Sequence, residues 1–403
     1  RSLASGIGMT ASTNEQNLPT LARELFERYD RFKLADIASR RFTQAEMVRW
    51  LKPLEAQKTF ESTPAGTSAE GRTISLLAAG GGKTTVLLWS QMHGDEPTAT
   101  MALIDILNFF AQSPDDRVVQ AIREMLTLLM IPMLNPDGAE RFQRRTAQMI
   151  DMNRDALKLE TPEARILRDV QERHRPEFGF NLHDQDPRYT VGSSKDVAAI
   201  ALLAPAMDEK KSEPPTRVQA KQVAATFAET MNLFVANHVT RFDDMFEPRA
   251  FGDTMQKSGT STVLVESGGW PNDRDKMFLR KLNVVGLLTS LYAIATGAYR
   301  EATLASYEQL PFNGKNLYDV IVRNAKLRAN NSAPAVNVDI GINIEEQRDE
   351  TTGRILLFGK IMDLGDLSTF GAFEEHDGTS LVLTDSQVRL EKMFPFRKGG
   401  KFF

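Results

Sequence analysis

Strand-like and helix-like segments alternate along the chain from Arg72 to Gly297, and this order restricts the fold more than any other feature of the sequence. The alternation is typical of an α/β domain, with a mixed, mainly parallel sheet and helices on both faces. Gly80 to Lys83, between the first two apolar runs, predict a hairpin turn. The predicted strands lie at 72–79, 84–91, 125–133, 178–182 and 262–265, and the predicted helices at 97–110, 161–173, 217–237 and 275–295.

The segments before and after this region show different patterns of apolar and charged residues. Residues 17–55 show a charged helical pattern, which predicts a helical N-terminal extension reaching to about residue 60. Short alternating β-type runs follow Ala305, at 320–327, 336–344, 355–361 and 381–383. We therefore expect one large domain over residues 1–300 and a small β-sandwich-like domain over residues 301–403.

Composition narrows the chemistry that such a chain can perform. Of its 403 residues none is Cys and five are His, and the formal net charge is −4. The lack of Cys excludes a disulfide scaffold, a thiol nucleophile and any metal site with thiolate ligands. The charge provides no basic field for nucleic acid, and no run of about 18 apolar residues predicts a membrane span. Any bound metal must therefore have His and carboxylate ligands.

The N-terminal residues leave the cellular location open. Residues 1–16 lack the hydrophobic core of a signal peptide. Because the chain starts at Arg1 and has Met9 inside, an earlier signal peptide remains an alternative. We expect a periplasmic or secreted location if a signal peptide has been removed, and a cytoplasmic location otherwise.

Four predicted strands are each followed at once by polar residues. In open α/β sheets, ligands bind beyond the carboxyl ends of the strands, so these four clusters are expected to meet in one crevice. The clusters are His93-Gly94-Asp95-Glu96, Asn135-Pro136-Asp137-Gly138, His183-Asp184-Gln185 and Glu266-Ser267-Gly268-Gly269.

Three of these residues form a candidate metal site. His93 and Glu96 are three positions apart, and His183 comes from another strand. Two His and one Glu leave a fourth position for water, as in catalytic zinc sites. A second His-x-x-Glu, from His174 to Glu177, precedes its strand, so we interpret it as solvated surface at the opposite edge.

Amide hydrolysis also needs a base beside the attacking water and groups that bind the substrate. Glu266, at the end of a buried strand, is expected to have a raised pKa suited to proton transfer, although a strand-end carboxylate can instead accept backbone hydrogen bonds. Asp151-Met152-Asn153-Arg154 supplies an amide and an arginine suited to a carboxylate. Arg141, Arg144 and Arg145 are candidates for stabilising an oxyanion, or for a charged surface.

Taken in order, these motifs resemble those of the zinc carboxypeptidases, the metallocarboxypeptidases related to carboxypeptidase A. That family has His-x-x-Glu, Asn-Pro-Asp-Gly, Asp-x-Asn-Arg, a His after a strand, and a Glu ending a late strand. All five occur here in that order, and the resemblance covers roughly Thr73 to Gly297. It implies a catalytic α/β domain of the zinc-carboxypeptidase type.

The resemblance also implies a role for each matching residue. One zinc ion would be held by His93, Glu96 and His183, and Glu266 would act as general base and then general acid. Asp151 would orient His93. The terminal carboxylate of a peptide would be bound by Asn153 and Arg154, and the carbonyl polarised by Arg144, with neighbouring Arg145 as the alternative substrate-binding arginine.

The chain departs from the family at one position. A mobile Tyr often precedes the catalytic Glu by some twenty residues, but the corresponding stretch, residues 241–252, has no Tyr. Tyr189 is a candidate substitute or a rim aromatic. The acidic residues Asp243, Asp244 and Glu247 of this stretch either favour cationic substrate side chains or form a solvated loop face.

Three functions therefore remain to be compared. The first is a zinc metallopeptidase that hydrolyses the C-terminal peptide bond of peptides. The second is a zinc amidase or deacylase acting on N-acyl amino acids or cell-wall peptides. The third is an inactive binding module of the same fold. The C-terminal segment looks similar to the small β-sandwich flanking some amidohydrolases, but no His-x-His occurs in the chain, so we expect a structural or interaction module there.

Overall fold

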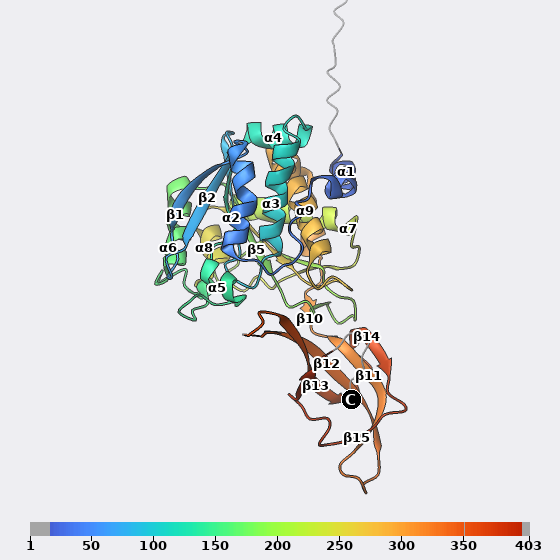
Figure 1. Ribbon diagram of the computed structural model, residues 1–403. Helices are drawn as coiled ribbons and strands as arrows, with labels where there is room; N and C mark the ends of the chain where they lie inside the picture. The colour runs from blue at the N-terminus through green and yellow to red at the C-terminus, as the bar shows by residue number, and fades with distance from the viewer. Residues whose placement is uncertain (1–16, 350, 397–403) are drawn as a thin grey trace, which may run out of the picture.

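The computed structural model describes residues 17–349 and 351–396. Residues 1–16, which bear on the signal-peptide question, lie outside the described residues. A larger part contains helices and strands, and a smaller part made of the C-terminal strands lies at one end of it (Figure 1).

An eight-stranded mixed sheet runs through the larger part, in the order β1-β2-β4-β3-β5-β9-β7-β8. The four central neighbours β4, β3, β5 and β9 are parallel to one another. The expected mixed, mainly parallel α/β sheet is therefore confirmed. The strands are β1 (Glu61–Thr67), β2 (Thr73–Gly80), β3 (Thr84–Ser90), β4 (Leu126–Ile131), β5 (Phe178–Asp184), β7 (Ile200–Leu203), β8 (Val239–Arg241) and β9 (Ser261–Ser267).

The predicted hairpin between β2 and β3 is wrong. Strand β4 lies between them, so that Met130 pairs with Leu77 on the antiparallel side and with Leu88 on the parallel side. The connecting loop packs against the start of β4, where a Cβ on Gly82 would lie 1.8 Å from the backbone carbon of Met125. The glycines do reverse the chain, but a local turn signal cannot show that a later strand will insert between the two arms.

Helices cover both faces of the sheet, as expected. In β3, Val86 and Leu88 join one apolar cluster, whereas Leu87 and Trp89 join another on the opposite face. The first cluster contains α1 (Leu18–Phe32), α2 (Gln44–Ala56), α3 (Thr98–Gln112), α4 (Arg117–Met125), α7 (Pro215–Asn232) and α9 (Met277–Thr296). The short helices α5 (Pro136–Arg141) and α10 (Ala305–Glu308) each add one buried residue to it. The second cluster contains α6 (Pro162–His174) and α8 (Phe251–Lys257).

Helix α9 belongs to the first and larger of these two apolar clusters. Its length and apolar composition would suffice to cross a membrane, but 78% of its apolar window is buried, and it packs against α3 and α7. A buried core helix is apolar on all sides for this reason. Arg280 of α9 forms a buried ion pair with Asp105 of α3, and the hydroxyl of Tyr29 donates to the same carboxylate. The N-terminal extension is thus attached to the core.

The C-terminal strands form a sheet of their own. Its path is β14-β11-β12-β13-β16, with β15 paired to β11, so hydrogen bonding joins all six strands in one sheet around an apolar cluster. A two-residue strand pair, β6 (Thr190–Val191) with β10 (Asn313–Gly314), connects this part to the larger sheet's loops. The boundary at residue 300 stays a prediction. The strands are β11 (Leu317–Arg328), β12 (Val336–Arg348), β13 (Ile355–Gly365), β14 (Gly371–Asp377), β15 (Val382–Thr384) and β16 (Met393–Pro395).

Candidate active site

The carboxyl ends of four parallel strands bring the predicted site residues to one edge of the sheet. His183 and Glu266 are directly paired in the register of β5 and β9. Ser90, at the end of β3, pairs with Leu182, so the loop carrying His93 and Glu96 begins beside His183. His174 lies at the end of α6, exposed and before β5, as expected for surface at the other edge.

His93, Glu96 and His183 are close enough to share one metal ion. One ligand atom from each lies within 4.8 Å of the others, and all three side chains are buried. Nδ1 of His93 is 2.8 Å from Glu96 Oε1, and Nδ1 of His183 is 2.7 Å from Glu96 Oε2. The two Nδ1 atoms are 3.2 Å apart. Ring nitrogens that converge on each other and on a carboxylate are better suited to a cation than to mutual hydrogen bonding.

The donor set fits zinc in particular. Two imidazole nitrogens and a carboxylate form a usual protein ligand set for catalytic zinc, with one coordination position left open. His183 Nε2 is buried and has no hydrogen-bond partner within residues 17–349 and 351–396, so the polar contacts of this ring are made by Nδ1, which faces Glu96 and His93. These residues could therefore hold the ion that the sequence predicted.

Electrostatics around these ligands favour a bound cation. Burial lowers the pKa of His93, but the carboxylates of Glu96 and Asp151 outweigh it and raise that pKa to about 9. Burial raises the pKa of Glu96, yet His93 and His183 hold it well below its usual value. Glu96 is thus an anion placed between two imidazoles.

Asp151 and Arg144 lie next to the candidate ligands. Asp151 Oδ1 is 3.1 Å from His93 Nε2, which suits it to orient the ring. Its other oxygen accepts from Nε and Nη2 of Arg144 at 3.2 and 3.1 Å. Nη1 of Arg144 reaches Glu96 Oε1 at 3.1 Å, although the side chain is 45% exposed. Arg144 is therefore both fixed by Asp151 and open to a ligand.

The expected substrate contact from Arg145 is not supported by its position. Its side chain points out of the site, where Nη1 donates to the carbonyl of Met149, and it lines neither the cavity around the ligands nor the larger cavity beside it. Consecutive residues of this loop face opposite ways. Only one of two adjacent arginines can reach the ligands, and sequence spacing could not say which.

Asn153 and Arg154 line the same cavity as the candidate ligands. The Asn153 amide oxygen accepts from the backbone of Phe251, which leaves its NH2 group as the donor for a substrate. Arg154 Nη1 donates to the carbonyl of Asn153, and its Nε is 3.7 Å from Glu247. The guanidinium is held near the cavity without a close bidentate partner in the described part of the chain.

The Asn135 to Gly138 motif contacts the backbone of the loops that carry His93 and Arg144. The side chain of Asn135 accepts from the backbone of Gly138, and its NH2 group donates to the carbonyls of Met92 and Arg144. Gly94 packs directly on Gly138, where a Cβ on Gly94 would lie 2.1 Å from a backbone carbon. This motif thus positions the two loops that carry the ligand His93 and Arg144.

Glu266 is partly exposed to the cavity beside the candidate ligands. Burial by surrounding protein raises its pKa well above the usual value, and the Glu96 carboxylate adds to this effect. Oε2 has no hydrogen-bond partner in the described part of the chain. The alternative, a carboxylate accepting backbone hydrogen bonds at a strand end, is not supported for that oxygen.

The sequence missed part of the cavity wall. The cavity measures about 430 Å³, and besides the predicted site residues its lining includes residues of the short strand β7, the loop after β8 and helix α8. The strand β7 and the helix α8 were not predicted, because they are too short for a periodic pattern. The unpredicted lining residues include Asn181, Leu203, Pro205, Met245, Ala250 and Asp253.

The acidic stretch contributes less than its composition suggested. Asp244 is turned toward Arg217 and Lys211, and Glu247 is paired with Arg249. Only Asp243 and Glu247 of the three line the cavity. Tyr189 also lines the cavity, in an edge-to-face contact with Phe242, and so stays a candidate substitute for the Tyr that residues 241–252 lack.

Comparison with known proteins agrees with this geometry. Residues 47–245 match the family model described as zinc carboxypeptidase. The matched segment belongs to the zinc carboxypeptidase family. The matched segment ends before Glu266, so the position of that residue rests on the register of β9 with β5.

Two relatives and one solved structure illustrate how far the similarity extends. The probable carboxypeptidase 2 of Arthroderma benhamiae is 31% identical over 189 residues, covering 46% of this chain and 34% of the relative. Cytosolic carboxypeptidase-like protein 5 of Rattus norvegicus is 36% identical over 78 residues, covering 19% and 9%. A metallo-carboxypeptidase from Burkholderia cenocepacia shares the fold, with a TM-score of 0.51, 18% identity and coverage of 64% of this chain and 70% of that one. This chain spans about a third of the length of the first fungal relatives.

The zinc-carboxypeptidase site predicts a metal requirement that can be tested ligand by ligand. His183→Ala should lower zinc affinity by at least about tenfold, because one of three protein ligands is lost. His174→Ala, an exposed histidine of the second His-x-x-Glu, is the matched control and should bind zinc as the wild type does. Equilibrium dialysis with metal analysis measures both. Equal zinc affinity in the two variants would contradict the ligand assignment.

Asp253 predicts a pH-dependent stability. Burial raises its pKa to about 6, so between that value and the ordinary pKa of ~3.9 the folded state holds a proton that the unfolded state has lost. Stability should therefore fall as pH rises through this window. Asp253→Asn should raise the free energy of unfolding at pH 8 by about 1–3 kcal/mol, with the gain vanishing near pH 4.

Urea unfolding from pH 4 to 8 measures this difference. Asp243→Asn is the control, because that side chain is 65% exposed and lines the same cavity. A stability difference for Asp253→Asn that stays constant across this pH range would show that ionisation of Asp253 is not its cause.

Proposed function

We propose that the protein is a zinc-dependent carboxypeptidase that hydrolyses the C-terminal peptide bond of peptides. The observation that carries this proposal is the convergence of His93, Glu96 and His183 within 4.8 Å, in a cavity that also contains Glu266 and Arg154. Family membership supports the reaction class.

Substrate binding is assigned to residues that face the cavity. A terminal carboxylate would accept hydrogen bonds from the NH2 group of Asn153 and the guanidinium of Arg154. Charge-assisted hydrogen bonds of this kind are about twice as strong as neutral ones. The 3.7 Å contact of Arg154 with Glu247 is loose, so a substrate carboxylate can compete for the guanidinium.

Hydrolysis combines the ligands with two further side chains. Zinc held by His93, Glu96 and His183 would act as a Lewis acid and lower the pKa of a water molecule. Glu266 would accept the proton of the attacking water and deliver it to the leaving amine, and its raised pKa suits both transfers. Arg144, held by Asp151, would donate hydrogen bonds to the oxyanion.

The shape of the site favours peptides over small N-acyl amino acids. A second cavity adjoins the catalytic one and shares the lining residues Glu96 and Arg144, which extends the site well beyond one amino acid. The interpretation as an inactive module is less favoured, because ligands, base and carboxylate-binding groups all line one cavity.

The proposed base predicts the outcome of one substitution. Glu266→Gln should lower turnover of blocked dipeptides by about 10²–10⁴-fold, because general-base catalysis is lost. The zinc content should be retained, since Glu266 is not a ligand. Glu172→Gln, an exposed position on α6, should behave as wild type. Zinc-loaded Glu266→Gln that turns over normally would exclude Glu266 as the base.

Recognition of the terminal carboxylate predicts a substrate preference. A blocked dipeptide should be hydrolysed about 10–100-fold more efficiently than its C-terminal amide, the effect of losing a charge-assisted contact. Arg154→Ala should abolish this preference, whereas Arg145→Ala should keep it, because Arg145 faces away. Comparison of kcat/KM for the two substrates measures it. Equal hydrolysis of acid and amide by the wild type would favour the amidase alternative.

A further inference from the structure

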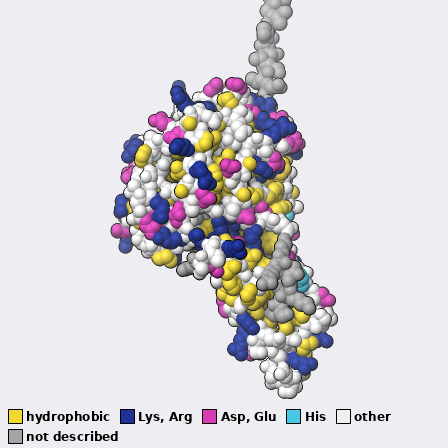
Figure 2. Space-filling view, in the orientation of Figure 1, with side chains coloured by type: hydrophobic (Ala, Val, Ile, Leu, Met, Phe, Trp, Pro, Cys, Tyr) yellow, Lys and Arg dark blue, Asp and Glu magenta, His cyan; other side chains and the backbone are white. Residues whose placement is uncertain are grey.

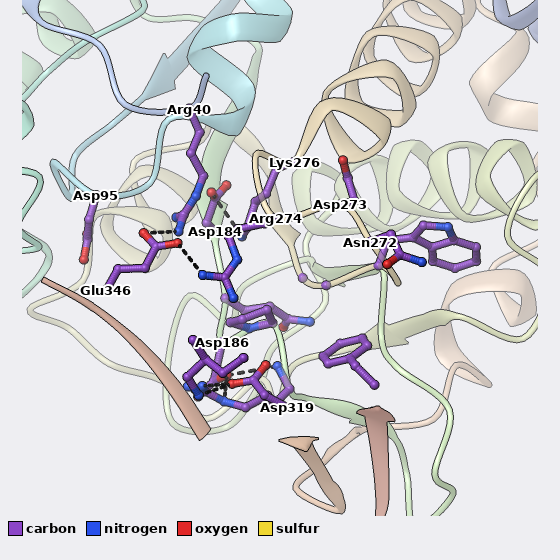
Figure 3. Close-up of a pocket in the computed structure, with 18 of the residues that line it drawn as sticks. Arg40, Asp95, Asp184, Asp186, Asn272, Asp273, Arg274, Lys276, Asp319 and Glu346 are labelled. Atoms are coloured by element: carbon purple, nitrogen blue, oxygen red, sulfur yellow. Dashed lines mark hydrogen bonds and ion pairs between the residues drawn. The ribbon is translucent and has the colours of Figure 1, made fainter. Parts of the chain in front are cut away.

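A second cavity of about 660 Å³ lies between the α/β part and the C-terminal β part. This volume is in the range of about 300–1,000 Å³ typical of ligand sites. Figure 3 shows side chains from both parts around it, and in Figure 2 basic side chains gather where the two parts meet. It adjoins the catalytic cavity through five shared lining residues, Glu96, Arg144, Asp184, Gln185 and Asp186.

The order of residues along the two cavities fixes which end of a substrate each would receive. Asn153 and Arg154 line only the catalytic cavity, so a terminal carboxylate belongs there. Glu96 and Arg144 line both, so the scissile bond lies at their junction. The substrate residues that precede this bond must leave on the other side, which is the second cavity.

The C-terminal part forms one wall of this second cavity. Ile344 and Leu357 pack partly on the core of that part and also line the cavity. Phe373 on β14 lines the cavity and is partly exposed, and it belongs to none of the apolar clusters of the described residues. A phenylalanine that packs in no core but faces a cavity is available to an apolar ligand group.

Ion pairs hold this wall at a fixed place relative to the metal ligands. Arg188, on the loop that follows His183, pairs with Asp319 of β11 at 3.0 Å. Glu346 of β12 pairs with Arg40 at 2.9 Å and lies 3.6 Å from Arg274, on the loop after β9 (Figure 3). Two active-site loops are therefore tied to the same sheet that carries Phe373.

We propose that the C-terminal β part is a component of the substrate site, and that it binds the peptide residues preceding the scissile bond, with an apolar side chain packed against Phe373. This inference rests on the proposed carboxypeptidase function. It makes peptides of three or more residues, rather than dipeptides, the substrates that the site fits. The C-terminal part then contributes to substrate selection without taking part in the chemistry.

A peptide-length series tests this proposal on the full chain with zinc. Blocked peptides with the same two C-terminal residues and none, one or two added leucines are compared, with added glycines as a control for length alone. In the wild type, kcat/KM should rise about tenfold with the leucines, as for a side chain buried in a binding site. Phe373→Ala should remove most of this gain through a higher KM.

Phe358→Ala is the matched control. Phe358 follows the cavity-lining Leu357 on β13 and therefore points to the opposite face of the sheet. It should keep the full gain with length. Thermal unfolding of both variants, together with Phe373→Leu, shows whether a loss comes from misfolding, which would lower dipeptide hydrolysis to the same extent.

The outcomes separate this inference from the proposed function. Dipeptide hydrolysis without a leucine gain in the wild type, or a gain that Phe373→Ala and Phe373→Leu both keep, would overturn the wall assignment alone. If no peptide is cleaved, the affinity of the zinc-loaded protein for the same peptides is measured. Tighter binding of the leucine peptides that is lost in Phe373→Ala would support the binding role of the C-terminal part and reject the carboxypeptidase function. No dependence of binding on length would then overturn both.

Discussion

The parallel alignment of β4, β3, β5 and β9 is the constraint on which the site depends. Parallel strands place all their carboxyl ends at one edge, so loops separated by many residues in the chain meet there. The direct pairing of His183 with Glu266 is a consequence of register alone. Moving β9 by one residue would turn Glu266 to the opposite face of the sheet.

A second constraint is charge. Glu96 is almost completely buried, and an isolated carboxylate in that place would cost several kcal/mol. His93, His183 and Arg144 surround it, and Asp151 in turn holds both His93 and Arg144. Substitution of any one member leaves a buried charge partly uncompensated. The same arrangement that permits metal binding therefore makes the site energetically interdependent.

The sequence predicted what local pattern and motif order encode. Strand ends carry His93, His183 and Glu266, and the edge of the sheet follows once the strands are parallel. Pairing between β2 and β4 could not be seen, because it depends on a strand that comes later in the chain. Arg144 contacts the candidate ligand Glu96, whereas Arg145 contacts the carbonyl of Met149, and residue spacing could not predict which of the two would do so. The walls from β7 and α8 were missed because segments of four and seven residues show little periodicity.

The connection between the two parts of the chain gives the C-terminal strands a direct link to the chemistry. After β5 delivers His183, the loop runs through Gln185 and Arg188 to β6, and each of these contacts the segment that leads into the C-terminal sheet or that sheet itself. A displacement of β11 would therefore shift the backbone immediately following a candidate zinc ligand. Because Arg40 and Arg41 also converge on Glu346, the N-terminal extension shares in this restraint. The N-terminal extension, the α/β part and the C-terminal sheet are thus connected by ion pairs and hydrogen bonds around the two adjoining cavities. For this reason the C-terminal sheet is better understood as a wall of the site than as an independent domain.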